Sequence, residues 1–129
     1  MRKATLALTL ILGIHNVMAP ASAFAHGEIT KSSPIANSIM PSAPTSIVMK
    51  FDGNLIVLAD KKSNFLSLLN SAGGEVKLSQ TSVKGSVISA KILQKLTAGR
   101  YKVNWRIVSE DGHPVKGSYF FTVSSKAKS

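Results

Sequence analysis

The chain has 129 residues, 44% of them hydrophobic, and no cysteine, which excludes disulfides and cysteine-bound metal sites. Its 16 basic and six acidic residues give a net charge of +10. A charge this positive occurs in nucleic-acid-binding proteins. Here, however, the lysines are dispersed along the whole chain, which favours a solvated basic surface facing acidic lipids or an acidic partner, with no nucleic acid as ligand.

Residues 1–25 have the features of a secretory signal peptide. Two basic residues follow Met1, the apolar run Ala4–Ile14 is too short to span a bilayer, and Ala23–Ala25 reads Ala-Phe-Ala, a signal-peptidase pattern. We predict export through the Sec pathway and removal of residues 1–25; an uncleaved amino-terminal anchor is the alternative. Removing 25 of 129 residues leaves 104, with 14 basic and six acidic residues, so the mature chain has a net charge of +8 and the size of one domain.

The mature chain is patterned for strands, because apolar residues recur at every second position and no sustained helical stripe occurs. Gly73-Gly74 predicts a hairpin turn. Short strands about ten residues apart predict a single all-β domain over residues 26–123, an immunoglobulin-like antiparallel β-sandwich with Greek-key connections, followed by a flexible tail over residues 124–129. In chain order, we expect strands over residues 47–51, 65–69, 75–78, 86–92, 101–108 and 117–123.

The strand over residues 101–108 has the clearest alternation, with Tyr101, Val103, Trp105 and Ile107 on one side and polar residues on the other. The preceding segment, Leu96–Tyr101, resembles a tyrosine corner, in which a tyrosine hydroxyl bonds to the backbone a few residues upstream. We therefore expect Trp105 to be a central core residue.

The loop between the last two predicted strands contains Asp111-Gly112-His113-Pro114. Residues two apart in an extended segment point in the same direction, so the side chains of Asp111 and His113 can converge on one ion. Pro114 restricts His113 toward extended conformations and stiffens the loop. A solvated histidine beside an ordinary Asp-Gly turn is the alternative explanation.

Cleavage of the leader would make His26 the first residue, and its α-amine and ring Nδ1 could then close a six-membered chelate on one metal ion. His26 and His113 would be the only histidines left. Together with Asp111 they offer three nitrogens and one oxygen, which suit a single Cu(II) ion better than Zn(II), Mg(II) or Ca(II). Met40 and Met49 are isolated, and Met49 is in phase with the core face of its strand.

Several features of the mature chain occur together: the amino-terminal His26, Ser33-Pro34, Phe51, and the segment Leu96–Gly117 with its Tyr-x-Val-x-Trp strand and Ser-x-Asp-x-His-Pro loop. They resemble the CopC family of periplasmic copper-binding proteins. The resemblance implies a cupredoxin-like or immunoglobulin-like β-sandwich in the periplasm that holds Cu(II) through His26, Asp111 and His113. It also implies delivery of the copper to a CopD-type inner-membrane transporter.

The chain departs from the family pattern in two places. Some members carry a second, Cu(I) site in a methionine-rich loop with an extra histidine, whereas Leu58–Leu69 contains neither residue. We therefore predict one Cu(II) site and no methionine-rich Cu(I) site. Members often have Phe-Ser-Glu after the first long strand, with the glutamate near copper; here the sequence is Phe51-Asp52-Gly53, so the sequence does not place Asp52 at the metal.

Our main hypothesis is a non-catalytic, monomeric copper carrier in copper homeostasis and resistance. One alternative is an oxidative enzyme resembling the copper polysaccharide monooxygenases, which also use an amino-terminal histidine. It is disfavoured because Asp111 would fill a position that oxygen chemistry needs vacant, and because Tyr101, Trp105, Tyr119 and Phe121 are expected in the core instead of on an aromatic platform. The other alternative is a metal-free structural immunoglobulin-like module.

Overall fold

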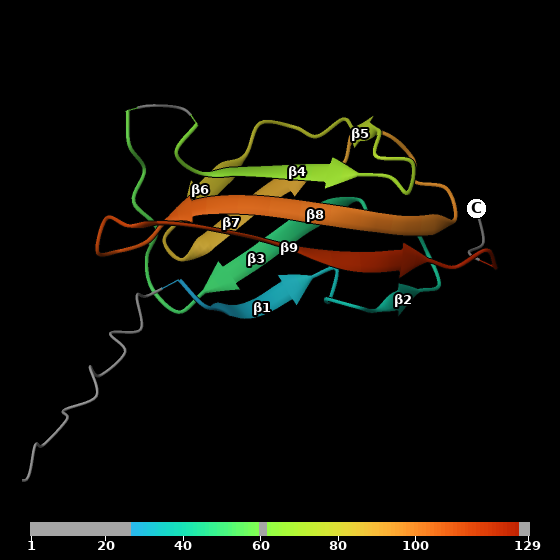
Figure 1. The fold of residues 1–129 in the computed structure, drawn as a ribbon, viewed down its shortest axis with the longest axis horizontal. Helices are drawn as coiled ribbons and strands as arrows, with labels where there is room; N and C mark the ends of the chain where they lie inside the picture. The colour runs from blue at the N-terminus through green and yellow to red at the C-terminus, as the bar shows by residue number, and fades with distance from the viewer. Residues whose placement is uncertain (1–26, 60–61, 127–129) are drawn as a thin grey trace, which may run out of the picture.

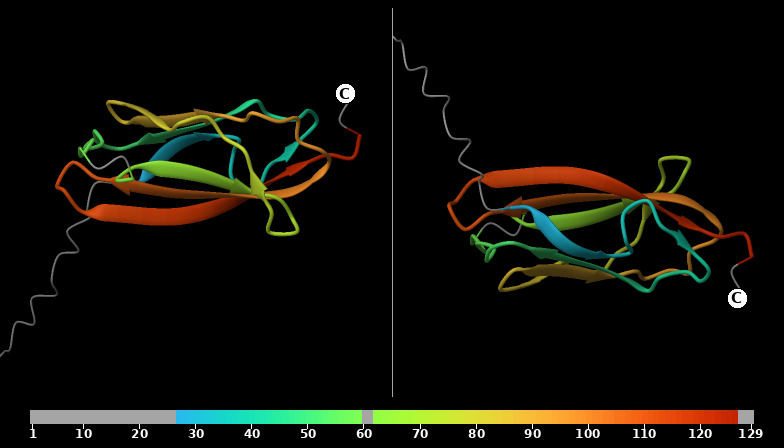
Figure 2. Two further views of the ribbon diagram at one scale, coloured as in Figure 1. Left: turned by 90° about the horizontal axis from the view of Figure 1, so that it is seen from above. Right: turned by 90° about the horizontal axis from the view of Figure 1, so that it is seen from below.

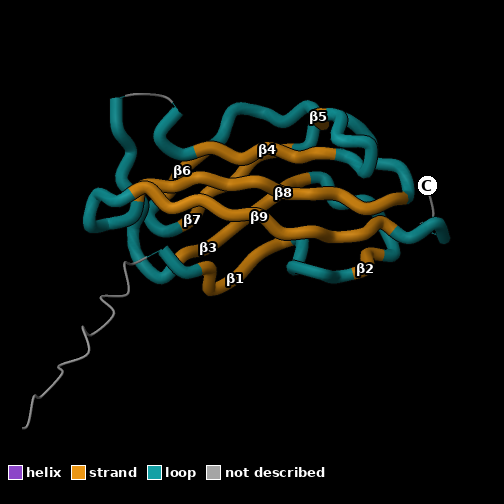
Figure 3. Tube along the Cα trace, in the orientation of Figure 1, coloured by secondary structure: helices purple, strands orange, loops and turns teal. Residues whose placement is uncertain are grey.

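Two β-sheets packed face to face make up the computed structural model, which describes residues 27–59 and 62–126 (Figures 1 and 2). These residues contain no helix, and hence none long and apolar enough to cross a membrane (Figure 3). The strands in the described part are β1 (Ile29–Ser33), β2 (Ile39–Met40), β3 (Ser46–Phe51), β4 (Phe65–Leu69), β5 (Glu75–Val76), β6 (Ser82–Lys84), β7 (Val87–Lys91), β8 (Gly99–Val108) and β9 (Pro114–Val123).

One sheet has the strand order β1-β3-β7-β6 and the other the order β2-β9-β8-β4-β5. Every pair is antiparallel except β2 with β9, which is parallel. The predicted all-β sandwich is confirmed, apart from this one short parallel pair, which apolar alternation does not predict. The β8–β9 hairpin is the longest element, pairing Gly99 with Val123 at one end and Val108 with Pro114 at the other.

The core lies between the sheets and follows the predicted two-residue period. In β3, β8 and β9 alternate side chains are buried while their neighbours face outward. Burying each large apolar side chain contributes about 1.5–3 kcal/mol, so without disulfides these alternating rows are the main source of stability. The rows are Ile47, Met49 and Phe51; Tyr101, Val103, Trp105 and Ile107; and Tyr119, Phe121 and Val123.

Trp105 is buried, as expected, but it lies toward one end of the core. Phe51 and Phe121 are each 1% exposed, whereas Trp105 is 9% exposed and lies three residues before β8 ends. Its ring meets Phe51 edge to face, with centroids 5.3 Å apart. The ring also covers Gly117, where an added Cβ would lie 2.6 Å from Trp105 Cζ2. Gly117 is therefore fixed by close packing in the same hairpin that carries the Asp111–His113 loop.

The predicted tyrosine corner is confirmed. The Tyr101 hydroxyl donates a hydrogen bond to the Thr97 carbonyl oxygen over 2.8 Å, and the Tyr101 ring stacks on Phe121 with centroids 5.5 Å apart. The bond joins the segment before β8 to the strand itself. It therefore fixes the end of the hairpin opposite the Asp111–His113 loop.

Apolar alternation does not predict β1, β2 or β6. All three are edge strands, held by a neighbour on one side only, and most of their side chains are exposed. Such strands are specified by backbone pairing more than by burial, so they leave little hydrophobic pattern in the sequence. Strand β5 is shorter than expected and ends at Val76, while β9 begins at Pro114, three residues earlier than expected.

Both ends of the chain extend beyond the described residues. Residues 1–26, which include the predicted signal peptide and His26, lie outside the described residues, as do residues 127–129 of the predicted tail. Within the described part, the backbone of Ser124 still donates a hydrogen bond to Met40 O over 2.9 Å.

Candidate metal centre

A five-residue loop, Ser109–His113, closes the β8–β9 hairpin at the end where β1 begins (Figure 1). The amide of Ser109 donates to His113 O, and the amide of Gly112 donates to Ser109 O, each over 2.9 Å. Gly112 has a φ of 85°, a conformation that glycine adopts without steric cost. The loop is therefore tightly closed by its own backbone, and its shape is fixed on a long, well-paired hairpin.

The side chains of Asp111 and His113 meet on this loop, as the two-residue spacing predicts. Asp111 Oδ2 lies 2.9 Å from His113 Nδ1, and Asp111 Oδ1 accepts a hydrogen bond from the His113 amide over 3.2 Å. The His113 side chain is 73% exposed and that of Asp111 is 37% exposed. The contact between Oδ2 and Nδ1 sets the orientation of the ring, and because the two atoms face each other both can bind one ion once Nδ1 has no proton.

Ser109 is a buried residue that holds Asp111 and His113 in place through its hydroxyl. It is 1% exposed, its hydroxyl donates a hydrogen bond to Asp111 Oδ1, and the same oxygen lies 3.1 Å from His113 O. The hydrogen bond from Ser109, followed by those from His113, holds the pKa of Asp111 well below its usual value. Asp111 is therefore an anion at neutral pH. The sequence signal for Ser109 is the serine of the Ser-x-Asp-x-His-Pro pattern, but its hydrogen bond to Asp111 follows only from the folded loop.

Asp52 lies at the same end of the sandwich, directly after β3. Its Oδ1 accepts hydrogen bonds from the amides of Gly27, over 2.7 Å, and Glu28, over 3.2 Å. Gly27 in turn packs on β9, because a Cβ built on it would lie 3.1 Å from Val115 Cγ2. The start of the described chain is therefore next to the strand that leaves the Asp111–His113 loop.

The described residues bring together two of the three side chains predicted as copper ligands. Within residues 27–59 and 62–126, no three His, Cys, Asp or Glu side chains are grouped so as to hold a metal ion. Asp111 and His113 therefore supply two ligands, and His26 lies outside the described residues. Met49 is fully buried in the core, as expected.

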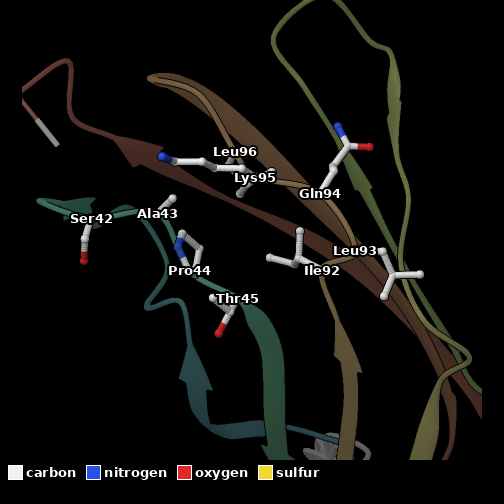
Figure 4. Close-up of a pocket in the computed structure, with 9 residues that line it drawn as sticks. All are labelled: Ser42, Ala43, Pro44, Thr45, Ile92, Leu93, Gln94, Lys95 and Leu96. Carbon is white, nitrogen blue, oxygen red and sulfur yellow. The ribbon is translucent and has the colours of Figure 1, made fainter. Parts of the chain in front are cut away.

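A cavity of about 650 Å³ lies at the opposite end of the sandwich, between the segments before β3 and after β7 (Figure 4). Its lining residues are Ser42, Ala43, Pro44, Thr45, Ile92, Leu93, Gln94, Lys95 and Leu96. The lining contains no histidine, carboxylate or thioether, so it does not offer the ligands that copper prefers.

The fold and the loop define the class: an antiparallel β-sandwich that presents an exposed carboxylate–imidazole pair at the end of its longest hairpin. The CopC domain family matches residues 29–124, and the chain belongs to this family. CopC proteins are copper-binding and copper-resistance proteins and not enzymes. The resemblance noted in the sequence is thereby confirmed.

Individual relatives agree with this assignment. Copper resistance protein C of Xanthomonas campestris pv. juglandis is 33% identical over 121 residues, which cover 89% of this chain and 93% of that protein. Copper transport protein CutJ of Bacillus subtilis is 32% identical over 117 residues, but the chain spans only 21% of its length. The crystal structure of PcoC, a methionine-rich copper resistance protein from Escherichia coli, superposes with a TM-score of 0.65 at 32% identity, covering 78% of this chain and 100% of that one.

Proposed function

We propose that this chain is a periplasmic carrier that binds one Cu(II) ion through His26, Asp111 and His113 and delivers it to a CopD-type membrane transporter. The observation that carries the proposal is the exposed pair of Asp111 and His113 on a CopC-family sandwich. One imidazole nitrogen and one carboxylate oxygen form half of a square of ligands. The chelating amine and imidazole of an amino-terminal histidine would form the other half.

The position of Gly27 supports His26 as the source of that second half. Export and cleavage after Ala25 would make His26 the first residue of a domain over residues 26–123. Consecutive Cα atoms are about 3.8 Å apart, and a Cβ built on Gly27 would lie 3.1 Å from Cγ2 of Val115, two residues after His113. Gly27, which would follow His26 in the mature chain, therefore lies beside the strand that leaves the loop, and this supports His26 as the third ligand.

The donor set favours Cu(II) over Cu(I). Three nitrogens and one oxygen in a tetragonal arrangement suit Cu(II), whereas Cu(I) prefers thioether and thiolate sulfur. The chain has four methionines; two precede residue 26, in the predicted leader, and Met49 is fully buried. This supports a single Cu(II) site without the methionine-rich site of some relatives.

Delivery to a transporter is supported by the exposure of the ligands. The imidazole of His113 is largely exposed at the tip of a hairpin, so a partner can reach the ion directly. CutJ, a copper transport protein, contains a region similar to this chain within a much longer protein. We infer that the carrier works next to a membrane transporter, with copper as cargo and not as a resident cofactor.

One added residue tests the ligand set. Placing a single alanine before His26 in the mature protein removes the α-amine from the chelate while leaving every described contact unchanged. We expect the Cu(II) affinity to fall by at least about tenfold, measured by competition with a chelator, and the nitrogen coupling of the residue 26 α-amine to disappear from the EPR spectrum.

The exported protein without the added alanine is the control. Mass spectrometry of the exported, unextended protein should show a chain that begins at His26 and binds one copper ion. A mature chain that begins elsewhere, or equal affinities with and without the added alanine, contradicts the proposed site.

A further inference from the structure

We propose that Asp52 is a positioning residue for copper binding. It binds the backbone of Gly27 and Glu28, the amino-terminal arm that follows His26, and so holds this arm beside the Asp111–His113 loop. This inference rests on the proposed function, since it takes His26 as a copper ligand. It differs from a role as copper ligand, because the atom concerned, Asp52 Oδ1, is occupied by two backbone amides.

The clamp has a rigid base. Asp52 directly follows Phe51, which is fully buried and paired across the sheet with Ile29, the first residue of β1. Three hydrogen bonds join Asp52 to the two residues before β1. Its Oδ1 accepts from the amides of Gly27 and Glu28, and its own amide donates to Glu28 O over 3.0 Å. The direction in which the chain enters β1 is therefore fixed from the β3 side.

A second contact fixes the arm from the β9 side. Gly27 has a φ of 153°, which L side chains rarely adopt, and a Cβ there would press against Val115 Cγ2 at 3.1 Å. The backbone of Gly27 is thus held between the Asp52 carboxylate and the Val115 side chain. Val115 pairs with Ile107 in the hairpin, so the arm and the Asp111–His113 loop share one support.

Holding the arm lowers the cost of forming the copper site. The first residues of a domain are usually poorly ordered unless they are tied down. A ligand on a free terminus loses that freedom when it binds, and fixing it in advance increases affinity. A clamp only needs an oxygen that accepts hydrogen bonds, which the amide of asparagine also provides. A ligand or a purely electrostatic role needs the negative charge.

Substitutions that keep the oxygen but remove the charge therefore distinguish a clamp from a copper ligand or an electrostatic role. We compare Asp52→Ala, Asp52→Asn and Glu28→Gln in mature protein with a verified His26 terminus. Glu28→Gln is the matched control, because it removes one exposed charge from the same segment but keeps the backbone amide that Asp52 binds. At 0.15 M ionic strength, where attraction by exposed charges is largely screened, we expect Asp52→Ala to lower Cu(II) affinity by about tenfold or more. Asp52→Asn and Glu28→Gln should stay within about twofold of the parent.

A second readout does not depend on copper. In the metal-free protein, the amide protons of Gly27 and Glu28 should exchange slowly in the parent and in Asp52→Asn, and fast in Asp52→Ala. If Asp52→Ala does not fold, slow exchange in the parent together with retained affinity in Asp52→Asn supports the clamp. Fast exchange of both amides in the parent overturns it.

The remaining outcomes are equally decisive. Equal losses in Asp52→Asn and Asp52→Ala, or a similar loss in Glu28→Gln, would show that charge matters and not the clamp. Full affinity in Asp52→Ala would show that the arm needs no anchor. If the alanine added before His26 has no effect on affinity, the proposed function fails first, and the exchange data then report on the hydrogen bonds alone.

Discussion

Three neighbouring groups on one short loop determine how the candidate copper ligands are held. The buried Ser109 hydroxyl bonds to the Asp111 carboxylate, which in turn contacts the ring of His113. Outer residues of this kind fix the orientation of metal-binding imidazoles and carboxylates. The chemistry of the site therefore depends on a serine that has almost no surface of its own.

We predict that Ser109→Ala lowers Cu(II) affinity by about 10–100-fold, the usual effect of removing such support. The variant also removes the main cause of the depressed Asp111 pKa, so this pKa should rise toward its usual value. Carboxyl ¹³C NMR of the metal-free protein measures the rise, and Ser109→Thr, which keeps the hydroxyl, should restore the depressed value. An unchanged Asp111 titration in Ser109→Ala would contradict the assigned role.

The pH dependence of copper binding should be set by the nitrogen ligands and not by Asp111. A depressed carboxyl pKa means that Asp111 stays ionised as the pH falls and loses its charge only in strong acid. The α-amine, with a reference pKa of about 7.7–8.0, and the imidazoles must instead lose protons to bind copper. Copper affinity should therefore fall steadily from pH 8 to pH 5 because of the nitrogen ligands alone. A flat profile over this range, measured by chelator competition, would exclude the nitrogen-rich ligand set.

The β8–β9 hairpin is the element that connects the core to the site. Trp105 and Gly117 face each other across the two strands, and the space beside the indole admits no side chain. The Asp111–His113 loop closes this hairpin. A change in the spacing of the two strands at Trp105 and Gly117 would therefore also shift the loop.

We predict that Gly117→Ala destabilises the fold by about 1–3 kcal/mol, the usual cost of forcing an extra methyl group into a packed contact. Chemical denaturation of the metal-free protein measures the change. Ser118→Ala is the control, since Ser118 is exposed on the outer face of the next position. If Gly117→Ala is as stable as Ser118→Ala, the close contact does not limit the fold.

The strands that could be predicted from the sequence are those in which every second side chain is buried, because this alternation appears in the sequence as apolar residues at every second position. Strands β3, β4, β7, β8 and β9 follow from their alternating apolar residues, and the pair of Asp111 and His113 follows from its two-residue spacing. The edge strand β1 could not be predicted, because backbone pairing holds it. Asp52 could not be assigned to the site for a similar reason: it acts on amides 24 and 25 residues away in the chain.

At the scale of the whole molecule, the charges are divided unevenly. The chain has a net charge of +10, yet four of the five carboxylates in the described residues lie at the end that carries the loop. They are Glu28, Asp52, Glu110 and Asp111, whereas Glu75 lies in β5. Glu110 and Asp111 lie in the loop itself, whereas the nearest basic pair of the hairpin, Arg106 and Lys116, lies three residues outside it on each strand. A Cu(II) ion that reaches the loop therefore meets carboxylates first, on a molecule whose net charge repels cations.

We predict that the local charges dominate the approach of copper. The association rate constant of Cu(II), measured by stopped flow, should fall by up to about tenfold as ionic strength rises from 0.01 to 0.15 M, because screening weakens attraction between separated charges. The double variant Glu28→Gln/Glu110→Gln should flatten this dependence, since both side chains are exposed and their removal leaves the loop hydrogen bonds intact. A rate that rises with salt would mean that the net positive charge governs the encounter. Copper would then reach the site against the field of the protein, and the clustering of carboxylates at this end would serve the fold of the loop and arm alone.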